Sequence, residues 1–225
     1  MKFTKKLMTA GATACLLIAP LANAHETDED KGPKVEKSYD FTDFTGIVVT
    51  GVYDVEIKVG PAYSIELEGK EKRMKYVEVE KSGDTLFLGM DEDGQGKRWN
   101  GHNNGIRAVI TLPDLDEVSL TGVGAIEASG IKAGKFVSEL EGVGSIELSG
   151  SCETLEASVA GIGSLDASDL ECENVEVDVE GMGSAEVYAS KSVDADIDGM
   201  GSIDVDGSPE DVKKSKSMMS SIDIR

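Results

Sequence analysis

Aromatic residues and histidine are scarce in this sequence of 225 residues. Aromatic residues make up 5% of the chain, with one tryptophan, and the two histidines are His25 and His102. His25 falls in the N-terminal leader and His102 in a long loop, so neither completes a Ser-His or Cys-His arrangement for nucleophilic catalysis. Leu, Ala, Gln and Arg are sparse relative to Val, Ile, Ser and Gly, and no long stretch repeats apolar residues at helical spacing. The composition therefore predicts an all-β fold.

Positive charge is also in short supply. Lysine and arginine number 22 against 43 acidic residues, which gives a formal net charge of -21 at pH 7. This field repels nucleic acid and anionic lipid, so we expect no nucleic-acid partner and instead attraction toward cations, basic proteins or neutral sugars. A polysaccharide lyase would need a well-placed basic residue in a cleft, and the repeat strands described below carry hardly any. No enzyme activity is predicted.

Long apolar runs are absent except at the N-terminus. There, lysines precede an apolar segment that ends at the small residues Ala22-Asn23-Ala24, the pattern of an export signal over residues 1–24. The run is shorter than the ~20 residues that a membrane-spanning helix needs. We expect a mature chain that begins at His25, has no integral membrane span, and is exported to the periplasm, the cell surface or the medium.

A short glycine phrase recurs five times in the second half of the chain. It begins at Gly122, Gly142, Gly161, Gly181 and Gly199, at intervals of 20, 19, 20 and 18 residues. Such a period is typical of a solenoid, in which each repeat stacks on the next. The segments around the glycines alternate apolar and polar residues, as half-buried strands do. We therefore predict a parallel β-helix, right-handed by the usual crossover preference, with about 19–20 residues per coil.

The alternation divides the repeat residues into inward and outward sets. The inward positions after the glycines are Ile126, Ile146, Leu165, Ala185 and Ile203. The glycines themselves are expected at corners, where positive φ and close backbone approach favour glycine. The residues between the paired glycines are expected to plug the corners of the core: Val123, Val143, Ile162, Met182 and Met200. A phosphate-binding loop is excluded because no phrase has the third glycine or the Gly-Lys-Ser/Thr that such loops need.

The rest of the chain divides around this repeat. Residues 25–38 are expected to form a flexible leader, residues 39–112 less regular N-terminal β coils, and residues 113–225 the regular β-helix with a C-terminal cap. In the cap, Lys214 and Lys216 replace the buried aliphatics of earlier coils, which protects the exposed end of a solenoid.

The sequence resembles the head GIN domain family, which is named for auto-transporter adhesins. The resemblance covers about residues 40–225 and is carried by FTGIVVTGVYDVEIKVG at 44–60, GDTLFLGM at 83–90 and IRAVITLPDLDEVSLTGVGAIEASG at 106–130, followed by the later Gly-x-Gly repeats. It implies an exported β-helical domain of the bacterial surface or periplasm, and it supplies no catalytic residues.

Two cysteines, Cys152 and Cys172, lie nine residues before successive repeat glycines. Strands in neighbouring coils lie ~4.8 Å apart, which suits the ~4.4–6.8 Å between the Cα atoms of a disulfide. Export favours oxidation, so the pair is a disulfide candidate, with two stacked thiols as the alternative.

A column of acids follows the inward aliphatics on the outward face: Glu127, Glu147, Asp166, Glu186 and Asp204. Like charges one coil apart repel. The column is therefore interpreted either as a solvated face or as a site for a divalent metal such as calcium. Calcium is the one metal considered, and no other cofactor is expected.

A long loop at residues 90–105 holds Arg98, Trp99 and His102. Loops on rigid scaffolds often carry recognition, and an exposed tryptophan can stack on a sugar ring. These three residues are candidate ligand contacts, with a disordered hairpin as the alternative. The leading functional hypothesis is an exported, non-enzymatic, adhesin-like interaction module of the cell envelope that binds a protein or a glycan. The alternative is a carbohydrate-active enzyme or sugar-binding domain that uses this loop and the acidic face.

Overall fold

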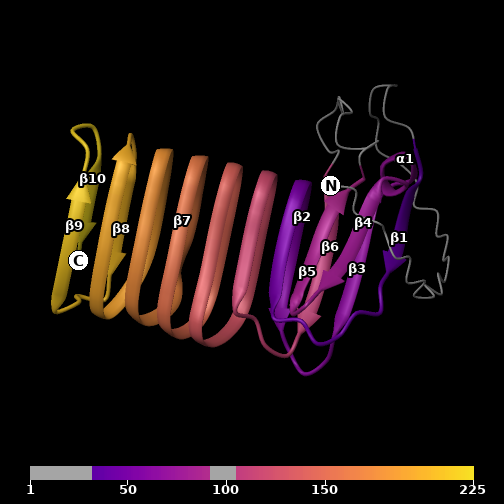
Figure 1. Ribbon diagram of the computed structural model, residues 1–225, viewed down its shortest axis with the longest axis horizontal. Coiled ribbons are helices and arrows are strands. Elements are labelled where there is room, and N and C mark those ends of the chain that lie inside the picture. The colour runs from indigo at the N-terminus through magenta and orange to yellow at the C-terminus, as the bar shows by residue number, and fades with distance from the viewer. Residues whose placement is uncertain (1–31, 92–104) are drawn as a thin grey trace, which may run out of the picture.

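The computed structural model describes residues 32–91 and 105–225, and nearly all of them belong to one open β-sheet system (Figure 1). The all-β prediction is confirmed. A single short helix, α1 (Glu71–Met74), occurs in the described residues, and the sequence analysis did not foresee it.

The described strands precede, form and follow one very long element. The bounds are β1 (Lys34–Ser38), β2 (Gly46–Val59), β3 (Ser64–Lys70), β4 (Val77–Ser82), β5 (Thr85–Met90), β6 (Ile106–Leu112), β7 (Glu117–Gly199), β8 (Ser202–Asp206), β9 (Asp211–Lys216) and β10 (Ser221–Ile224). β7 runs for 83 residues, and its successive segments lie side by side in Figure 1. We call each segment from one phrase-initial glycine to the next a turn of the chain.

Equivalent residues of neighbouring turns stand beside one another in parallel register. β2 pairs with the start of β7 so that Gly51 faces Gly122, and β7 pairs with β8 so that Ser184 faces Ser202. β8 in turn pairs with β10, where Ile203 faces Ile222. The glycine phrase is therefore extended at both ends, by the segment around Gly51 and by β10.

The N-terminal end is built differently, from antiparallel pairs. β1 pairs with β3, β3 with β6, and β4 with β5, all antiparallel. Residues 34–38 thus form an edge strand of the sheet, so the expectation of a flexible leader over residues 25–38 is wrong for these five residues, and residues 25–31 lie outside the described ranges. The local sequence KVEKS has one valine among charged and polar residues, and it gives no turn or periodicity signal to indicate a partner some 30 residues away.

The core follows the period-two alternation. The five aliphatics expected to face inward after the glycines, Ile126, Ile146, Leu165, Ala185 and Ile203, are all at most 2% exposed. They share one cluster with the N-terminal aromatics Phe44 and Tyr53. One apolar core therefore runs the length of the described residues and fixes which side chains point outward.

The C-terminal end carries lysines in place of core aliphatics. In β9, Lys214 stands opposite Ala195 and Lys216 opposite Ile197 of the preceding turn. Every residue of β9 is exposed. These placements are the ones expected of a polar end strand, which offers charge rather than an apolar edge to other chains.

Candidate binding surface

The glycine corners are held by backbone-to-backbone contact. Gly122, Gly142, Gly161, Gly181 and Gly199 all have positive φ between +100° and +147°. A Cβ atom on Gly142 would overlap the carbonyl oxygen of Gly122 in the turn before it, and one on Gly122 would overlap that of Gly51. Glycine is required at these corners because a side chain there would occupy the space of the adjacent turn.

The residues between the paired glycines point outward. Val123, Val143, Ile162, Met182 and Met200 are 49, 49, 52, 49 and 45% exposed, so the expectation that they plug the corners of the core is wrong. Period-two alternation continues through the bend: Leu140 and Ile146 are buried and the two glycines take the inward places between them, so Val143 falls on the outward side. The side chain between the glycines is left on the outer edge of the bend.

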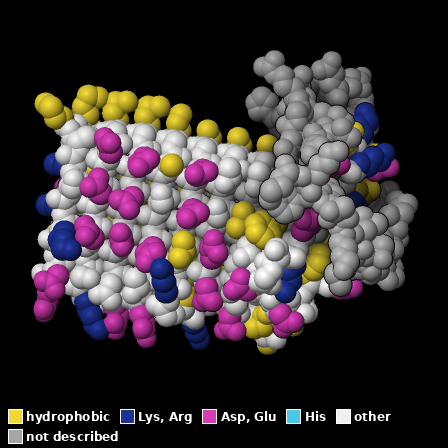
Figure 2. Space-filling view, viewed as in Figure 1, with side chains coloured by type: hydrophobic (Ala, Val, Ile, Leu, Met, Phe, Trp, Pro, Cys, Tyr) yellow, Lys and Arg dark blue, Asp and Glu magenta, His cyan; other side chains and the backbone are white. Residues whose placement is uncertain are grey.

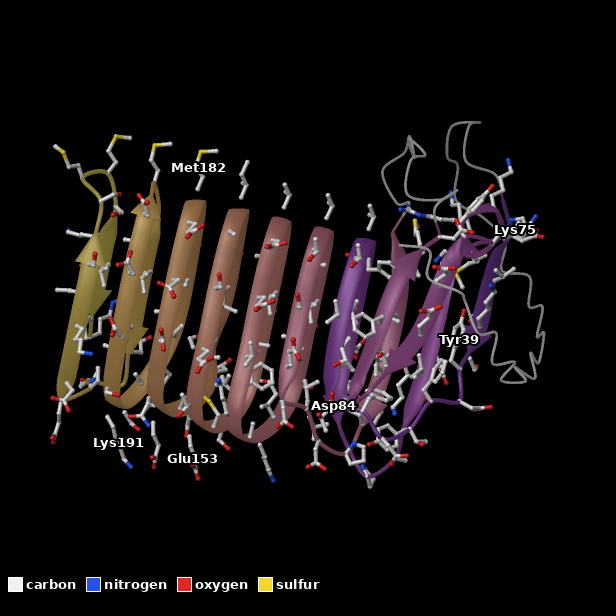
Figure 3. The ribbon with its side chains drawn as sticks, viewed as in Figure 1. Tyr39, Lys75, Asp84, Glu153, Met182 and Lys191 are labelled. Carbon is white, nitrogen blue, oxygen red and sulfur yellow. A yellow bond between two sulfur atoms is a disulfide. The ribbon has the colours of Figure 1, made fainter. Side chains whose placement is uncertain are left out.

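These five residues form what we call the apolar ridge. Figure 2 shows apolar side chains in a row along one edge of the molecule, and Figure 3 shows Met182 on that edge, pointing away from the ribbon. A shallow groove of about 410 Å³ runs beside the ridge, floored by glycine and serine: Gly163, Ser164, Gly183, Ser184, Gly201 and Ser202. The ridge and this groove together place an exposed apolar side chain beside glycine and serine on successive turns.

The acid column points outward from the strands that follow the glycine bends. Glu127, Glu147, Asp166 and Glu186 are exposed and Asp204 is half-buried. Glu127 faces Glu56 of β2, and Glu186 faces Asp204. Basic side chains form ion pairs with acids near both ends of the acid column. The guanidinium of Arg107 lies 2.9 Å from a carboxylate oxygen of Glu56, and that of Arg225 lies 2.7 Å from a carboxylate oxygen of Asp204. Within the described ranges, no group of three or more His, Cys, Asp or Glu is arranged to hold a metal ion.

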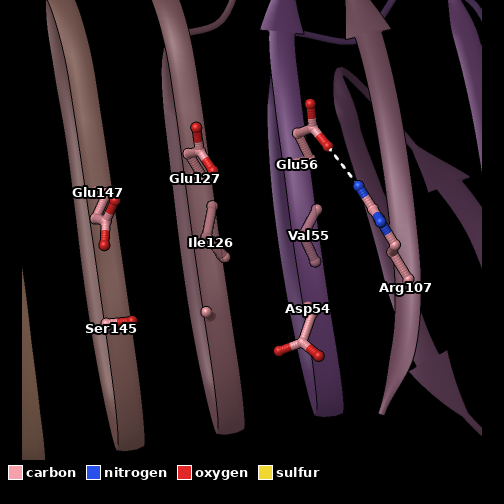
Figure 4. A pocket seen from close by; sticks show the side chains of 9 residues that line it. Asp54, Val55, Glu56, Arg107, Ile126, Glu127, Ser145 and Glu147 are labelled. Atoms are coloured by element: carbon pink, nitrogen blue, oxygen red, sulfur yellow. Dashed lines mark hydrogen bonds and ion pairs between the residues drawn. The ribbon is translucent and has the colours of Figure 1, made fainter.

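A second groove, of about 320 Å³, opens at the N-terminal end of the acid column (Figure 4). The charged groups of its lining come from Asp54, Glu56, Arg107, Glu127 and Glu147. Hydrogen bonds from Lys58 and then Arg107 lower the pKa of the Glu56 carboxyl, so Glu56 stays ionised at neutral pH. Sequence reasoning missed Arg107, because nothing in residues 106–112 shows that β6 pairs with β2.

Acidic side chains of the same and the next turn lie near Asp178, farther along β7. Partial burial raises the pKa of Asp178, and the carboxylates of Glu176, Asp196, Asp194 and Glu180 add to the effect. The negative charge of the chain is thus concentrated on neighbouring turns, and it attracts cations to this part of the surface.

The structure joins Cys152 and Cys172 by a disulfide, with their Cα atoms 4.5 Å apart. The bond links equivalent positions of two neighbouring turns. Side chains beside it continue the same cross-turn contacts: the Ser190 hydroxyl donates to the Cys172 carbonyl at 3.3 Å, and Lys191 lies 2.6 Å from Glu173. This region is therefore fastened between turns by covalent, polar and ionic contacts.

The three candidate ligand contacts Arg98, Trp99 and His102 lie outside the described residues, so their role stays a prediction. The signal segment 1–24 lies outside them as well. Among helices of the part of the chain that the structure describes, none is long and apolar enough to cross a membrane.

Comparison with known proteins bears on the fold and the family. The family described as "Putative auto-transporter adhesin, head GIN domain" matches residues 43–209. A crystal structure of a "putative adhesin" from Bacteroides fragilis NCTC 9343 is 22% identical, with a TM-score of 0.69, and the match covers 87% of this chain and 98% of that one. A "putative adhesin" from Parabacteroides merdae ATCC 43184 is 17% identical, with a TM-score of 0.51 and coverage of 86% and 97%. None of the curated proteins matches this chain.

Proposed function

We propose that the chain, which belongs to the family described as "Putative auto-transporter adhesin, head GIN domain", is an exported, non-enzymatic, adhesin-like module of the cell envelope that binds a protein or glycan partner. The export signal at residues 1–24 supports this location, either the periplasm or the surface. Residues 113–225 are proposed to form a right-handed parallel β-helix, supported by the parallel register between turns and by the stacked glycines.

The apolar ridge is the observation that carries this function. Side chains of similar kind stand on five successive corners, each about half exposed. Exposed apolar side chains that form a contiguous strip mark interaction surfaces more often than singly scattered ones. The adjoining glycine and serine floor carries the hydroxyls of Ser164, Ser184 and Ser202, which suits an extended partner that lays an apolar strip along the ridge and hydrogen bonds to these hydroxyls.

Site-specific photo-crosslinking in cells tests this proposal. A benzophenone amino acid at position 143, on the ridge, is expected to give discrete adducts with one envelope component. The same amino acid at position 212 is the control, because Val212 is an exposed apolar residue, 41% accessible, that lies in β9 away from the ridge. Equal crosslinking from both positions would contradict the assignment of the ridge.

A second experiment tests for a glycan partner, because photo-crosslinking detects protein partners better than glycans. The double variant Val143→Ser and Ile162→Ser is expected to lose binding on a glycan array or to isolated envelope material, whereas Val212→Ser keeps it. Loss in both variants would indicate non-specific adsorption by apolar residues.

The second candidate is a carbohydrate-active enzyme or sugar-binding domain, favoured by the groove of about 320 Å³ that is lined by an aspartate, three glutamates and an arginine. A glycosidase needs one carboxylic acid that keeps its proton near neutral pH, whereas the pKa of Glu56 is lowered by Lys58 and Arg107. Release of reducing sugar from a polysaccharide panel, abolished by Glu127→Gln and Glu147→Gln, would support the enzyme over the module.

A further inference from the structure

The apolar ridge changes its chemistry toward the C-terminus. Its first three members are the branched aliphatics Val123, Val143 and Ile162, and its last two are Met182 and Met200. Two more methionines, Met218 and Met219, are 103 and 67% exposed. Four exposed thioethers therefore gather at the end of the molecule where the ridge terminates (Figure 3).

Backbone contacts place these methionines on neighbouring turns. The backbone N–H of Met200 donates to the carbonyl of Gly181 at 2.7 Å, and Ser184 faces Ser202, so Met200 stands beside Met182. On the C-terminal side of Met200, the Ser217 hydroxyl donates to the Gly199 carbonyl at 2.5 Å, and Ser221 faces Ser202. Met218 and Met219 thus occupy the bend opposite Met200.

The fold itself does not require methionine at this corner. Valine and isoleucine occupy the equivalent place on the three preceding turns, with the same exposure of about half. A methionine side chain loses more rotamer freedom when ordered than valine does, and in water its sulfur gains no packing. The change from valine to methionine therefore replaces one apolar surface by another and adds only the thioether.

Thioether sulfur is a soft ligand that selects Cu(I) over the hard cations. Adjacent strands lie about 4.8 Å apart, and metal–sulfur bonds of about 2.3 Å are typical of protein sites. Because methionine has three rotatable bonds, sulfurs from neighbouring turns can converge on one ion. Two exposed acids, Glu180 and Asp198, precede Met182 and Met200 by two residues. Their negative charge attracts any cation, so it does not account for the presence of thioether side chains.

We propose that Met182, Met200, Met218 and Met219 form a binding site for Cu(I), with thioether sulfurs from consecutive turns as its ligands. Binding changes no oxidation state and breaks no bond. The two cysteines Cys152 and Cys172 are held in a disulfide and do not compete as thiolates. Cu(I) binding at these sulfurs is independent of partner binding elsewhere on the ridge.

Silver(I), a soft cation that resists oxidation, is the first probe. The protein carries ¹³C-labelled methionine methyl groups and is titrated with Ag(I) in chloride-free buffer, with the four resonances assigned from single Met→Leu variants. The methyl signals of the four ridge-end methionines are expected to shift together and saturate, whereas those of the buried Met74 and Met90 stay in place. Failure of the Met182 and Met200 signals to shift at a tenfold excess of Ag(I) overturns the site.

Cu(I) itself is then measured under argon by competition with a chromogenic Cu(I) chelator. A variant with leucine at all four positions is expected to bind at least tenfold more weakly, and its circular dichroism melt shows whether it is folded. The control is Glu127→Gln with Glu147→Gln, which removes surface carboxylates but no sulfur and is expected to bind as the wild type does. Equal affinity in the four-leucine variant and the wild type overturns the proposal, as does loss of binding in the carboxylate control.

Discussion

Gly142 lies directly against Gly122, so closely that a Cβ atom on Gly142 would overlap the Gly122 carbonyl oxygen. Gly142 also has a φ of +125°. Gly142→Ala is therefore expected to destabilise the protein by about 1–3 kcal/mol from backbone strain, with the steric overlap adding to it. Urea unfolding followed by circular dichroism measures the loss.

The matched control is Gly134→Ala, because no atom lies within 4 Å of a Cβ at Gly134. Alanine is favoured over glycine inside a strand by roughly 0.5–1 kcal/mol, so this change is expected to be neutral or stabilising. Similar destabilisation at positions 134 and 142 would show that the close contact between turns is not what requires glycine.

The disulfide between Cys152 and Cys172 closes a segment with a sequence separation of 20. A loop of that size is expected to contribute about 3 kcal/mol through the reduced entropy of the unfolded chain. Cys152→Ala with Cys172→Ala should lower the urea midpoint to that of the reduced wild type. Intact-mass analysis supplies the check: two alkyl groups added to the wild type without reductant would contradict the bond.

The lysines of β9 are expected to prevent end-to-end association. Lys214→Val with Lys216→Ile restores an apolar edge on the strand beside Ala195 and Ile197, and exposed apolar edge strands pair with other chains. Sedimentation velocity should show concentration-dependent oligomers. Lys132→Val with Lys135→Val removes two exposed lysines elsewhere and should leave a monomer pattern like that of the wild type; oligomers from this control would point to lost charge alone.

Tyr53 is fully buried and its hydroxyl donates to the Gly89 carbonyl at 2.7 Å. Burial, with a smaller effect from Tyr39, raises the pKa of Tyr53. A tyrosine in the unfolded chain has a pKa of about 10. The contribution of the buried, protonated Tyr53 to stability is therefore present below that pH and is lost as the pH rises above it. Tyr53→Phe should cost about 1 kcal/mol at pH 7 for the lost hydrogen bond.

Urea melts of wild type and Tyr53→Phe at pH 7 and pH 11 separate these two effects. The stability difference between the two proteins is expected to shrink at pH 11, because only the wild type pays to keep this phenol protonated. A difference that is the same at both pH values would mean that Tyr53 ionises in the folded protein as easily as in the unfolded chain.

The parts of the fold that depend on local alternation were predictable from the sequence. Ile146 and Leu165 were expected inside and are buried, and Lys214 was expected over the aliphatic file and lies opposite Ala195. The register followed from the repeat because equal spacing places equivalent residues together. Family membership was also predictable, from the motifs at residues 44–60 and 106–130, and the family match confirms it.

The errors have two sources. Period-two alternation counted from buried Leu140 to buried Ile146 places Val143 outside, and the expectation that it plugs a corner of the core departed from that count. The pairing of β1 with β3 and the approach of Arg107 to Glu56 depend on contacts between segments that share no repeat. Pairing between distant antiparallel strands could therefore not be predicted from the sequence, whereas the register of the repeated half could.

The shared register has a consequence for the size of the molecule. Each turn of β7 is built against the one before it, as the glycine contacts show, and such arrays gain stability through nearest neighbours. Duplicating residues 142–160 should lengthen the protein by about 4.8 Å and leave both ends unchanged. The span between the N-terminal antiparallel strands and the terminal lysines is thus set by copy number, so that gene duplication can tune how far such a protein reaches.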